Sequence, residues 1–247
     1  MGINPEDQVE KKKKAERNGE YGAESFSLIT YYFSLFLKNA WEWFLEALFP
    51  PRCLVCRREG AYLCEKHNRF LPAPPSEAEF HFLDDIHAAT KYFSSPSEQC
   101  VEFFKFKGGR HLGKIFATEM VKTTPRKLLE GGVLVPIPLH WTRKFWRGFN
   151  QAEVLAREIS RMTGLPLSTN LQRQKYTRQQ ARLSRSDRSR NIHGIFRWRG
   201  KEIPPKIILV DDVVASGATL DEAAKILKES GCQEVVAVVF ARGGKNR

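Results

Sequence analysis

The stretch Ile207-Ile208-Leu209-Val210-Asp211-Asp212-Val213-Val214-Ala215-Ser216-Gly217-Ala218-Thr219 predicts a strand, a tight turn and the start of a helix. Its first four residues are apolar and favour β structure, which suits a strand buried on both faces of a parallel sheet. Ser216, Gly217 and Thr219 suit a helix N-terminus, where unpaired backbone N–H groups converge and the helix dipole favours negative charge. The stretch therefore predicts a phosphate-binding turn at the carboxyl edge of a sheet.

Two adjacent carboxylates, Asp211 and Asp212, stand beside this turn, where a site for phosphate alone would not place negative charge. A sugar diol between the phosphate and a metal ion would account for them, whereas the alternative is a solvated turn that carries two aspartates by chance. The pattern resembles the phosphoribosyl pyrophosphate (PRPP) loop of type I phosphoribosyltransferases. That resemblance implies that Asp211 and Asp212 hold the ribose hydroxyls. It also implies a set of ligands for the 5′-phosphate: Ala215, Ser216, Gly217, Ala218 and Thr219.

Length and composition limit the classes of protein that the chain can belong to. Its 247 residues suit one α/β domain with appendages, or two small units, and a hydrophobic content of 42% is typical of globular proteins. A net charge of +12 favours anionic partners such as nucleotides, pyrophosphate or a nucleic-acid backbone, and does not choose among them. The sequence contains no run of about 18 apolar residues, so we expect no membrane-spanning helix. No cleavable signal peptide is evident either, and we expect a cytoplasmic protein.

The N-terminal part of the chain changes character at residue 25. Residues 1–24 are polar and rich in lysine, which predicts a disordered basic tail. Residues 25–49 predict an amphipathic helix with a broad apolar face, ended by two prolines. The rest of the protein, a protein partner or second copy, or a membrane surface must cover that face.

Two pairs of metal-binding residues follow, Cys53-Leu-Val-Cys56 and Cys64-Glu-Lys-His67. Their spacing predicts a closed structural Zn²⁺ site in a module of residues 50–75, in preference to a redox pair or to buried free cysteines. Clustered cysteines also argue against a secreted disulfide framework. Cys100 and Cys232 are isolated in apolar surroundings and are predicted to be core residues.

The middle of the chain predicts alternating helices and strands. Residues 80–93 suit one or two edge strands, and residues 97–104 and 111–122 have helical spacing. The basic link between these helices, residues 105–110, is either a solvated turn or a secondary anion-binding candidate.

A second strand, a basic loop and a helix follow. Residues 133–139 predict a strand that its prolines must end or bend, residues 143–151 a basic loop with a glycine, and residues 152–162 a helix. This order makes a second turn that faces an anion. In phosphoribosyltransferases the loop after the first core strand takes the pyrophosphate, and the resemblance of Arg-Gly-Phe to that loop implies such a role for Arg143, Arg147 and Gly148.

The order of these motifs resembles the competence protein ComF family. The double-cysteine pairs, Val-Pro-Ile-Pro-Leu, Arg-Gly-Phe-Asn-Gln-Ala and the acidic-pair loop carry the resemblance, which covers about residues 47–242. His67 stands where the family more often has cysteine, and Ser216 where threonine is commoner. The resemblance implies an α/β fold of the type I phosphoribosyltransferase class, a Rossmann-like parallel sheet flanked by helices, in residues 76–247. The small N-terminal zinc-binding module and the amphipathic helix precede it.

Residues 168–199 form the most basic stretch and lack apolar periodicity through most of their length. They could form a hood that closes over a reaction centre, a nucleic-acid-binding arm, or a solvated loop. Their place between core strands favours the hood.

The predicted activity is transfer of ribose 5-phosphate from PRPP, held with Mg²⁺, to an unidentified acceptor with release of pyrophosphate. Asp211, Asp212 and Arg147 are the predicted catalytic residues. No general base is evident beside them. The alternative is a PRPP-fold protein without catalysis that binds single-stranded DNA during DNA uptake, as the family's competence role implies.

Overall fold

The structure is a computed structural model that describes residues 50–73, 80–94, 96–174 and 194–243. The predicted tail, the predicted amphipathic helix and most of the predicted hood lie outside these residues. The prediction that a protein partner or a second copy covers that helix therefore also falls outside the described part. Compactness divides the chain into a small unit, described at residues 50–52 and 58–61, and a large unit, described over the remainder. Among the described residues, none of the helices combines the length and the apolar character that a membrane crossing needs.

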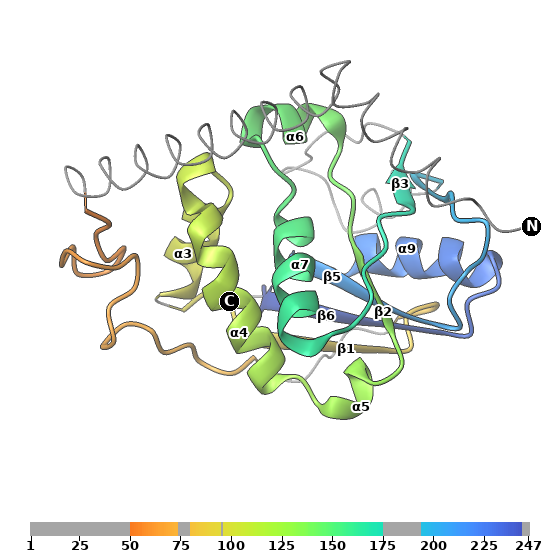
Figure 1. Ribbon diagram of the computed structural model, residues 1–247, viewed down its shortest axis with the longest axis horizontal. Helices are drawn as coiled ribbons and strands as arrows, with labels where there is room; N and C mark the ends of the chain where they lie inside the picture. Colours follow the sequence, from red (N-terminus) through yellow and green to blue (C-terminus); the bar gives the residue numbers. More distant parts are fainter. Residues whose placement is uncertain (1–49, 74–79, 95, 175–193, 244–247) are drawn as a thin grey trace, which may run out of the picture. The chain divides into compact units, whose positions relative to one another are not determined.

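The large unit is built on a parallel sheet of four strands in the order β1-β6-β5-β2 (Figure 1). The strands are β1 (Asp85–Lys91), β2 (Val133–Pro136), β5 (Lys206–Val214) and β6 (Glu234–Arg242), and every neighbouring pair is parallel. All four carboxyl ends therefore lie at the same edge of the sheet. The sheet is the α/β core that the sequence predicts.

The alternation of side chains along β5 explains why the sheet is covered on both faces. Ile208 and Val210 lie in an apolar cluster with residues of α4 (Leu112–Thr123) and α7 (Gln151–Thr163). Ile207 and Leu209 lie in a second cluster with residues of α9 (Ala218–Glu229). Because successive residues of a strand point to opposite faces, a continuous apolar run serves both layers.

Most predicted elements are found with small shifts at their ends. The predicted helix at residues 97–104 is α3 (Ser97–Phe104), and the helix predicted at 111–122 is α4, preceded by a 3₁₀ turn, η1 (Lys107–His111). A further short helix, α5 (Arg126–Leu129), leads into β2. Residues 85–91 of the predicted edge strand form β1, which does lie at an edge of the sheet.

Two expectations were wrong in detail. The predicted basic loop at residues 143–151 contains a helix, α6 (Trp141–Arg147), because the His140 side chain caps its start by accepting from the Thr142 N–H at 3.3 Å. The strand that was expected to end at Val210 continues to Val214, so the acidic pair belongs to β5. A short antiparallel pair, β3 (Leu171–Arg173) and β4 (Phe196–Trp198), was not predicted.

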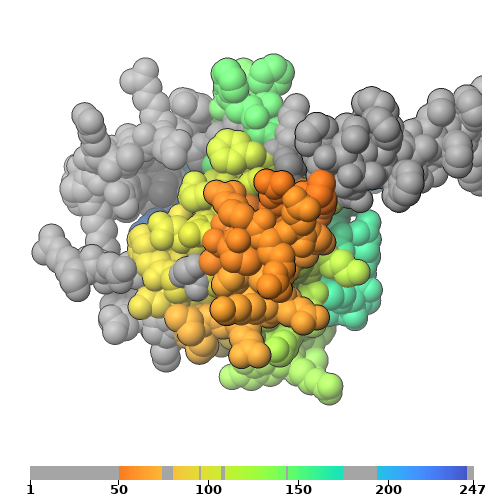
Figure 2. Space-filling model, turned by 90° about the vertical axis from the view of Figure 1, so that its left-hand side faces the viewer, coloured from red at the N-terminus to blue at the C-terminus, as the bar shows by residue number. Residues whose placement is uncertain are grey.

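The double-cysteine segment of the large unit is attached to the core by apolar side chains. Leu63 is buried, the Tyr62 ring centre lies 5.5 Å from that of Phe103 on α3, and Phe70 lies edge-on to Phe240 at 5.1 Å. Figure 2 shows orange residues of the segment at the surface, next to the yellow residues of α3. The segment therefore contributes to the main core as well as forming its own cluster.

Candidate functional site

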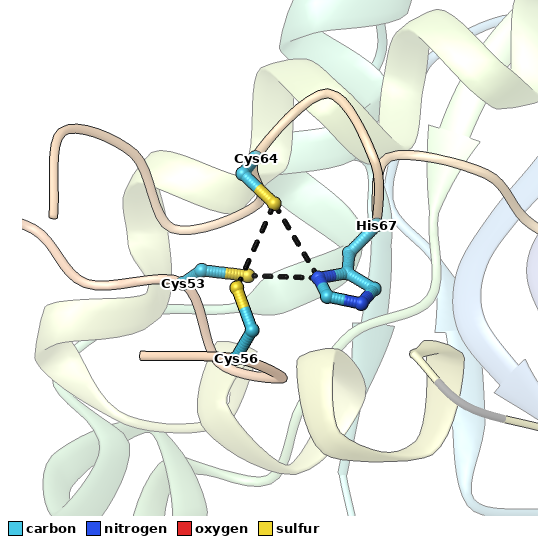
Figure 3. A group of neighbouring side chains, drawn as sticks. All are labelled: Cys53, Cys56, Cys64 and His67. Carbon is cyan, nitrogen blue, oxygen red and sulfur yellow. Dashed lines mark hydrogen bonds between the residues drawn. The ribbon is translucent and has the colours of Figure 1, made fainter. Parts of the chain in front are cut away.

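The four predicted metal ligands lie together in the large unit (Figure 3). The Nδ1 atom of His67 lies 3.6 Å from Sγ of Cys53 and 3.4 Å from Sγ of Cys64, and Sγ of Cys56 lies 3.8 Å from Sγ of Cys64. All four ligand atoms lie within 4.8 Å of one another. Zn–S and Zn–N bonds would separate neighbouring ligands of a tetrahedron by roughly 3.5–3.8 Å, so these residues fit the ion.

Tight turns bring the two ligands of each pair together. The Arg57 N–H donates to the Cys53 carbonyl at 2.8 Å, and the His67 N–H donates to the Cys64 carbonyl at 2.8 Å. Arg57 adopts a left-handed conformation with φ of 64°, which is uncommon for a residue with a side chain. The chain thus accepts local strain next to Cys56 where the first turn closes.

The cysteines differ in their ionisation. Burial would raise the pKa of Cys53, but hydrogen bonds from the backbone at Cys56, Cys64 and Val55 lower that pKa to about 5. Cys53 is therefore a thiolate at neutral pH, the form that binds metal. Burial, with the charge of Cys53, raises the pKa of Cys100 to about 12, and Cys100 lies in the core as predicted.

A pocket of about 200 Å³ lies at the carboxyl ends of β2 and β5. Its lining comes from the acidic-pair loop, the segment after β2, the residue after α3, the end of α6 with the start of α7, and β3. The polar residues of its lining are Lys105, Arg147, Asn150, Gln151, Arg173, Asp211, Asp212 and Thr219. Ligands of open α/β sheets bind at this edge, so the pocket is the candidate site of the described chain.

The acidic pair is partly buried at the end of β5. The Asp212 N–H donates to Asp211 Oδ1 at 2.9 Å, and the Val213 N–H donates to Asp212 Oδ1 at 3.0 Å. Burial, followed by the charge of Asp212, raises the pKa of Asp211 well above its usual range, and the charge of Arg147 opposes the rise only in part. A hydroxyl-bearing or cation-carrying ligand would relieve this repulsion.

The predicted phosphate turn leads directly into α9. Gly217 is the N-cap of that helix and has φ of 77°, and a Cβ there would lie 2.2 Å from Cε1 of Phe80. One oxygen of Asp221, Oδ1, accepts from the backbone N–H groups of residues 81–83 at 3.1, 2.8 and 3.1 Å. The turn is therefore backed by a segment that α9 itself holds in place.

We expect Gly217→Ala to lower the free energy of unfolding by roughly 1–3 kcal/mol, because an L-residue is strained at this φ and its Cβ would displace Phe80. Gly131→Ala is the matched control, since Gly131 has φ of 69° and nothing within 4 Å of its added Cβ. Urea unfolding of both variants measures the difference. Equal losses of unfolding free energy in the two variants would show that displacing the Phe80 ring has no energetic cost.

The structure brings together some predicted ligands and leaves others outside the pocket lining. Asp211, Asp212, Thr219 and Arg147 line it. The remaining residues of the phosphate turn precede Thr219 without lining the pocket, and these are Ala215, Ser216, Gly217 and Ala218. Gly148 ends α6 with φ of 79°, and the side chain of Arg143 lies outside the described part.

Hydrogen bonds fix the cationic side of the pocket. Arg147 Nη1 donates to Gln151 Oε1 at 3.2 Å, and Gln151 Nε2 donates to the Lys105 carbonyl at 3.3 Å. Asn150 Nδ2 donates to the carbonyl of Ile137 at 3.0 Å, which ties the segment after α6 to the segment after β2. Lys105 was only a secondary candidate in the sequence, and Gln151 was predicted as part of the loop without a role.

Comparison with known proteins shows what the chain is similar to. Residues 147–247 match the family model of the phosphoribosyl transferase domain, which includes Arg147 and the whole acidic-pair loop. The chain is 29% identical to Competence protein F of Haemophilus influenzae over 203 residues, covering 78% of this chain and 85% of that protein. It is 30% identical to Competence protein ComFC of Streptococcus pneumoniae over 156 residues, covering 63% of this chain and 68% of that protein.

The chain belongs to the ComF family. The family and the phosphoribosyltransferase fold that the order of motifs predicts are thereby confirmed. Another relative is the DNA utilization protein YhgH of Escherichia coli K12, 36% identical over 107 residues. That match spans 41% of this chain and 45% of YhgH, so it covers less than half of either protein.

Solved structures resemble the ComF chain less closely. The allosteric regulatory enzyme of purine biosynthesis has a TM-score of 0.39 at 18% identity, over 57% of this chain and 30% of that one. Glutamine PRPP amidotransferase from B. subtilis has a TM-score of 0.38 at 17% identity, again over 57% and 30%.

Proposed function

We propose that the chain binds PRPP with Mg²⁺ in the pocket and transfers ribose 5-phosphate to an acceptor, releasing pyrophosphate. One observation carries this proposal: the acidic pair and Thr219 line the same pocket as Arg147. Carboxylates suit a ribose diol and a cation suits pyrophosphate, and the two ends of PRPP need both. Membership of the ComF family and the match to a phosphoribosyl transferase domain support it.

The proposed roles follow from residue chemistry. Asp211 and Asp212 orient the ribose hydroxyls, and the turn from Ser216 to Thr219 holds the 5′-phosphate at the start of α9. Arg147 stabilises the charge that develops on pyrophosphate as its bond to the ribose C1 breaks and the acceptor bonds to C1. Mg²⁺, for which carboxylate and phosphate oxygens are the preferred ligands, would neutralise part of that charge.

We assign the cluster of Cys53, Cys56, Cys64 and His67 to structural Zn²⁺. Its four protein ligands make a closed set, with no position left for a substrate. The role proposed for the ion is therefore to hold the segment on which Tyr62 and Leu63 reach the core.

The test is thermal unfolding of the full chain with PRPP and Mg²⁺. PRPP at a hundredfold excess over its Kd should stabilise the protein by about 2.7 kcal/mol, and the effect should need the metal. Release of pyrophosphate in the presence of candidate nucleobases and amines would then identify the acceptor. An unchanged unfolding temperature at saturating PRPP and Mg²⁺ would disprove the binding proposal.

Binding of single-stranded DNA is the second candidate function, and the surface of α6 favours it. Trp141, Phe145 and Trp146 are 73%, 78% and 83% exposed, and the green residues of α6 project at the top of Figure 2. The helix also contains three basic residues and no acid. Exposed aromatic rings beside positive charge suit the stacking of unpaired bases. The names of the relatives, competence and DNA utilization, agree with this function.

We expect the full chain to bind single-stranded oligonucleotides with a log affinity that falls with log salt, by about 0.7 per phosphate contact. Phe145→Ala with Trp146→Ala should weaken binding by about tenfold or more at every salt concentration, because base stacking is lost while phosphate contacts remain. Met162→Ala, which removes an exposed apolar side chain of α7, is the control. Binding that is absent, or equal in all three proteins, would contradict this function.

A further inference from the structure

Lys105 lines the pocket although it comes from a different part of the chain than either predicted loop. It follows the last residue of α3, and its side chain is 26% exposed. Its ammonium lies 2.5 Å from Glu102 Oε1, and the Tyr92 hydroxyl donates to the same oxygen at 2.8 Å. Glu102, itself held by Tyr92, thus fixes the position of the Lys105 ammonium.

Gln151 links the backbone of Lys105 to the side chain of Arg147. Its amide nitrogen donates to the Lys105 carbonyl and its amide oxygen accepts from Arg147. Asp211 and Asp212 line the pocket from the end of β5, so the cations and the carboxylates come from separate groups of elements. Lys105 and Arg147 are therefore two of the three cationic residues in the pocket lining, and the third is Arg173.

The ionisation of this group agrees with its hydrogen bonds. The hydrogen bond from Lys105 lowers the pKa of Glu102, with smaller contributions from Tyr92 and from the charge of Arg147. Burial and the neighbouring Glu102 raise the pKa of Tyr92, so its hydroxyl keeps the proton that it donates. Hydrogen bonds from Lys105 and Tyr92 hold Glu102 as a carboxylate, and Glu98 and Asp212 are the other charges that act on Tyr92.

We propose that Lys105 binds the pyrophosphate of PRPP together with Arg147, and that Glu102 and Tyr92 position its ammonium. This inference rests on the proposed function and adds a residue to it. Pyrophosphate carries several negative charges, which a single guanidinium compensates only in part. A lysine ammonium has three N–H groups, so the one that bonds Glu102 leaves others for phosphate oxygens.

The test separates the two ends of the ligand. Calorimetry with Mg²⁺ measures inorganic pyrophosphate and ribose 5-phosphate binding, each alone, to the full-length chain and its variants. We expect Lys105→Met to weaken pyrophosphate binding by about 10- to 100-fold and ribose 5-phosphate binding by less than about twofold. Lys105→Arg should recover most of the loss, and Lys122→Met, which removes an exposed lysine outside the pocket lining, should match the wild type.

The positioning role is tested by a double-mutant cycle. Tyr92→Phe should weaken pyrophosphate binding a few-fold in the wild-type background and leave it unchanged in Lys105→Met, because there is no ammonium left to position. Equal losses of both ligands in Lys105→Met, or additive losses in the cycle, would overturn the inference. A wild-type chain that binds neither ligand nor PRPP would instead overturn the proposed function itself.

Discussion

Replacing both Cys53 and Cys56 with serine should remove bound zinc and lower the free energy of unfolding by about 4 kcal/mol or more. Binding of structural Zn²⁺ contributes directly to folding free energy, and two thiolates are half of this ligand set. Leu63, Tyr62 and Phe70 also pack on the main core, so release of the segment would expose apolar surface beyond the cluster. For a domain of this size the unfolding temperature should fall by roughly 10 °C.

Metal analysis of the purified protein and calorimetric unfolding measure the two effects. Cys232→Ala is the control, because Cys232 lies in the core away from the cluster and should retain stoichiometric zinc. His67→Cys should also retain zinc, since cysteine is an accepted ligand at that position of the site. Unchanged zinc content in the double variant would show that the ligand assignment is wrong.

The second large effect concerns the pocket. Asp212→Asn combined with Ser216→Ala should abolish the stabilisation by PRPP, about 2.7 kcal/mol at a hundredfold excess over Kd. One substitution removes a charge from the ribose site and the other removes a hydroxyl from the phosphate turn. Asp85→Asn, at an exposed carboxylate of β1, should keep the full PRPP effect. A normal PRPP response in the double variant would refute these roles.

Asp211→Asn should separate stability from binding at the same site. The folded pKa of Asp211 lies above its unfolded value, so the stability that this group contributes is fully present below about pH 4 and is lost as pH rises through the folded pKa. At neutral pH the substitution should therefore raise the stability of the unliganded protein while weakening PRPP binding. Unfolding curves at acidic and neutral pH, with and without PRPP, test both signs. A loss of stability in exchange for ligand binding is common at functional sites.

Several features could be predicted because neighbouring residues carry them. The apolar run at residues 207–210 indicated a strand buried on both faces, and both faces are covered. The spacings of Cys53, Cys56, Cys64 and His67 predicted a cluster that the structure forms, because each pair closes within one turn of backbone. The proline-containing strand at 133–139 was also predicted, although only residues 133–136 are β structure.

Other features were predicted wrongly or not at all, and the physical reasons can be identified. α6 was predicted as a loop because its basic residues conceal a helical segment, and the cap from His140 depends on one side-chain contact. β5 runs through the acidic pair because its pairing with β6 continues to Val214, which apolar periodicity does not register. The pairing of β3 with β4 joins residues near the two ends of the basic stretch, and three-residue strands carry little pattern.

The sequence by itself determined the family through the order of its motifs, and it determined the parallel core and the cluster of Cys53, Cys56, Cys64 and His67 through short local patterns. Only the tertiary structure decided which side chains share the pocket. Lys105 meets Arg147 through Gln151, and Phe80 lies against Gly217, because the strands and helices between them fold back to one edge of the sheet. Such contacts depend on how distant elements pack, and neither periodicity nor spacing within the chain specifies that packing.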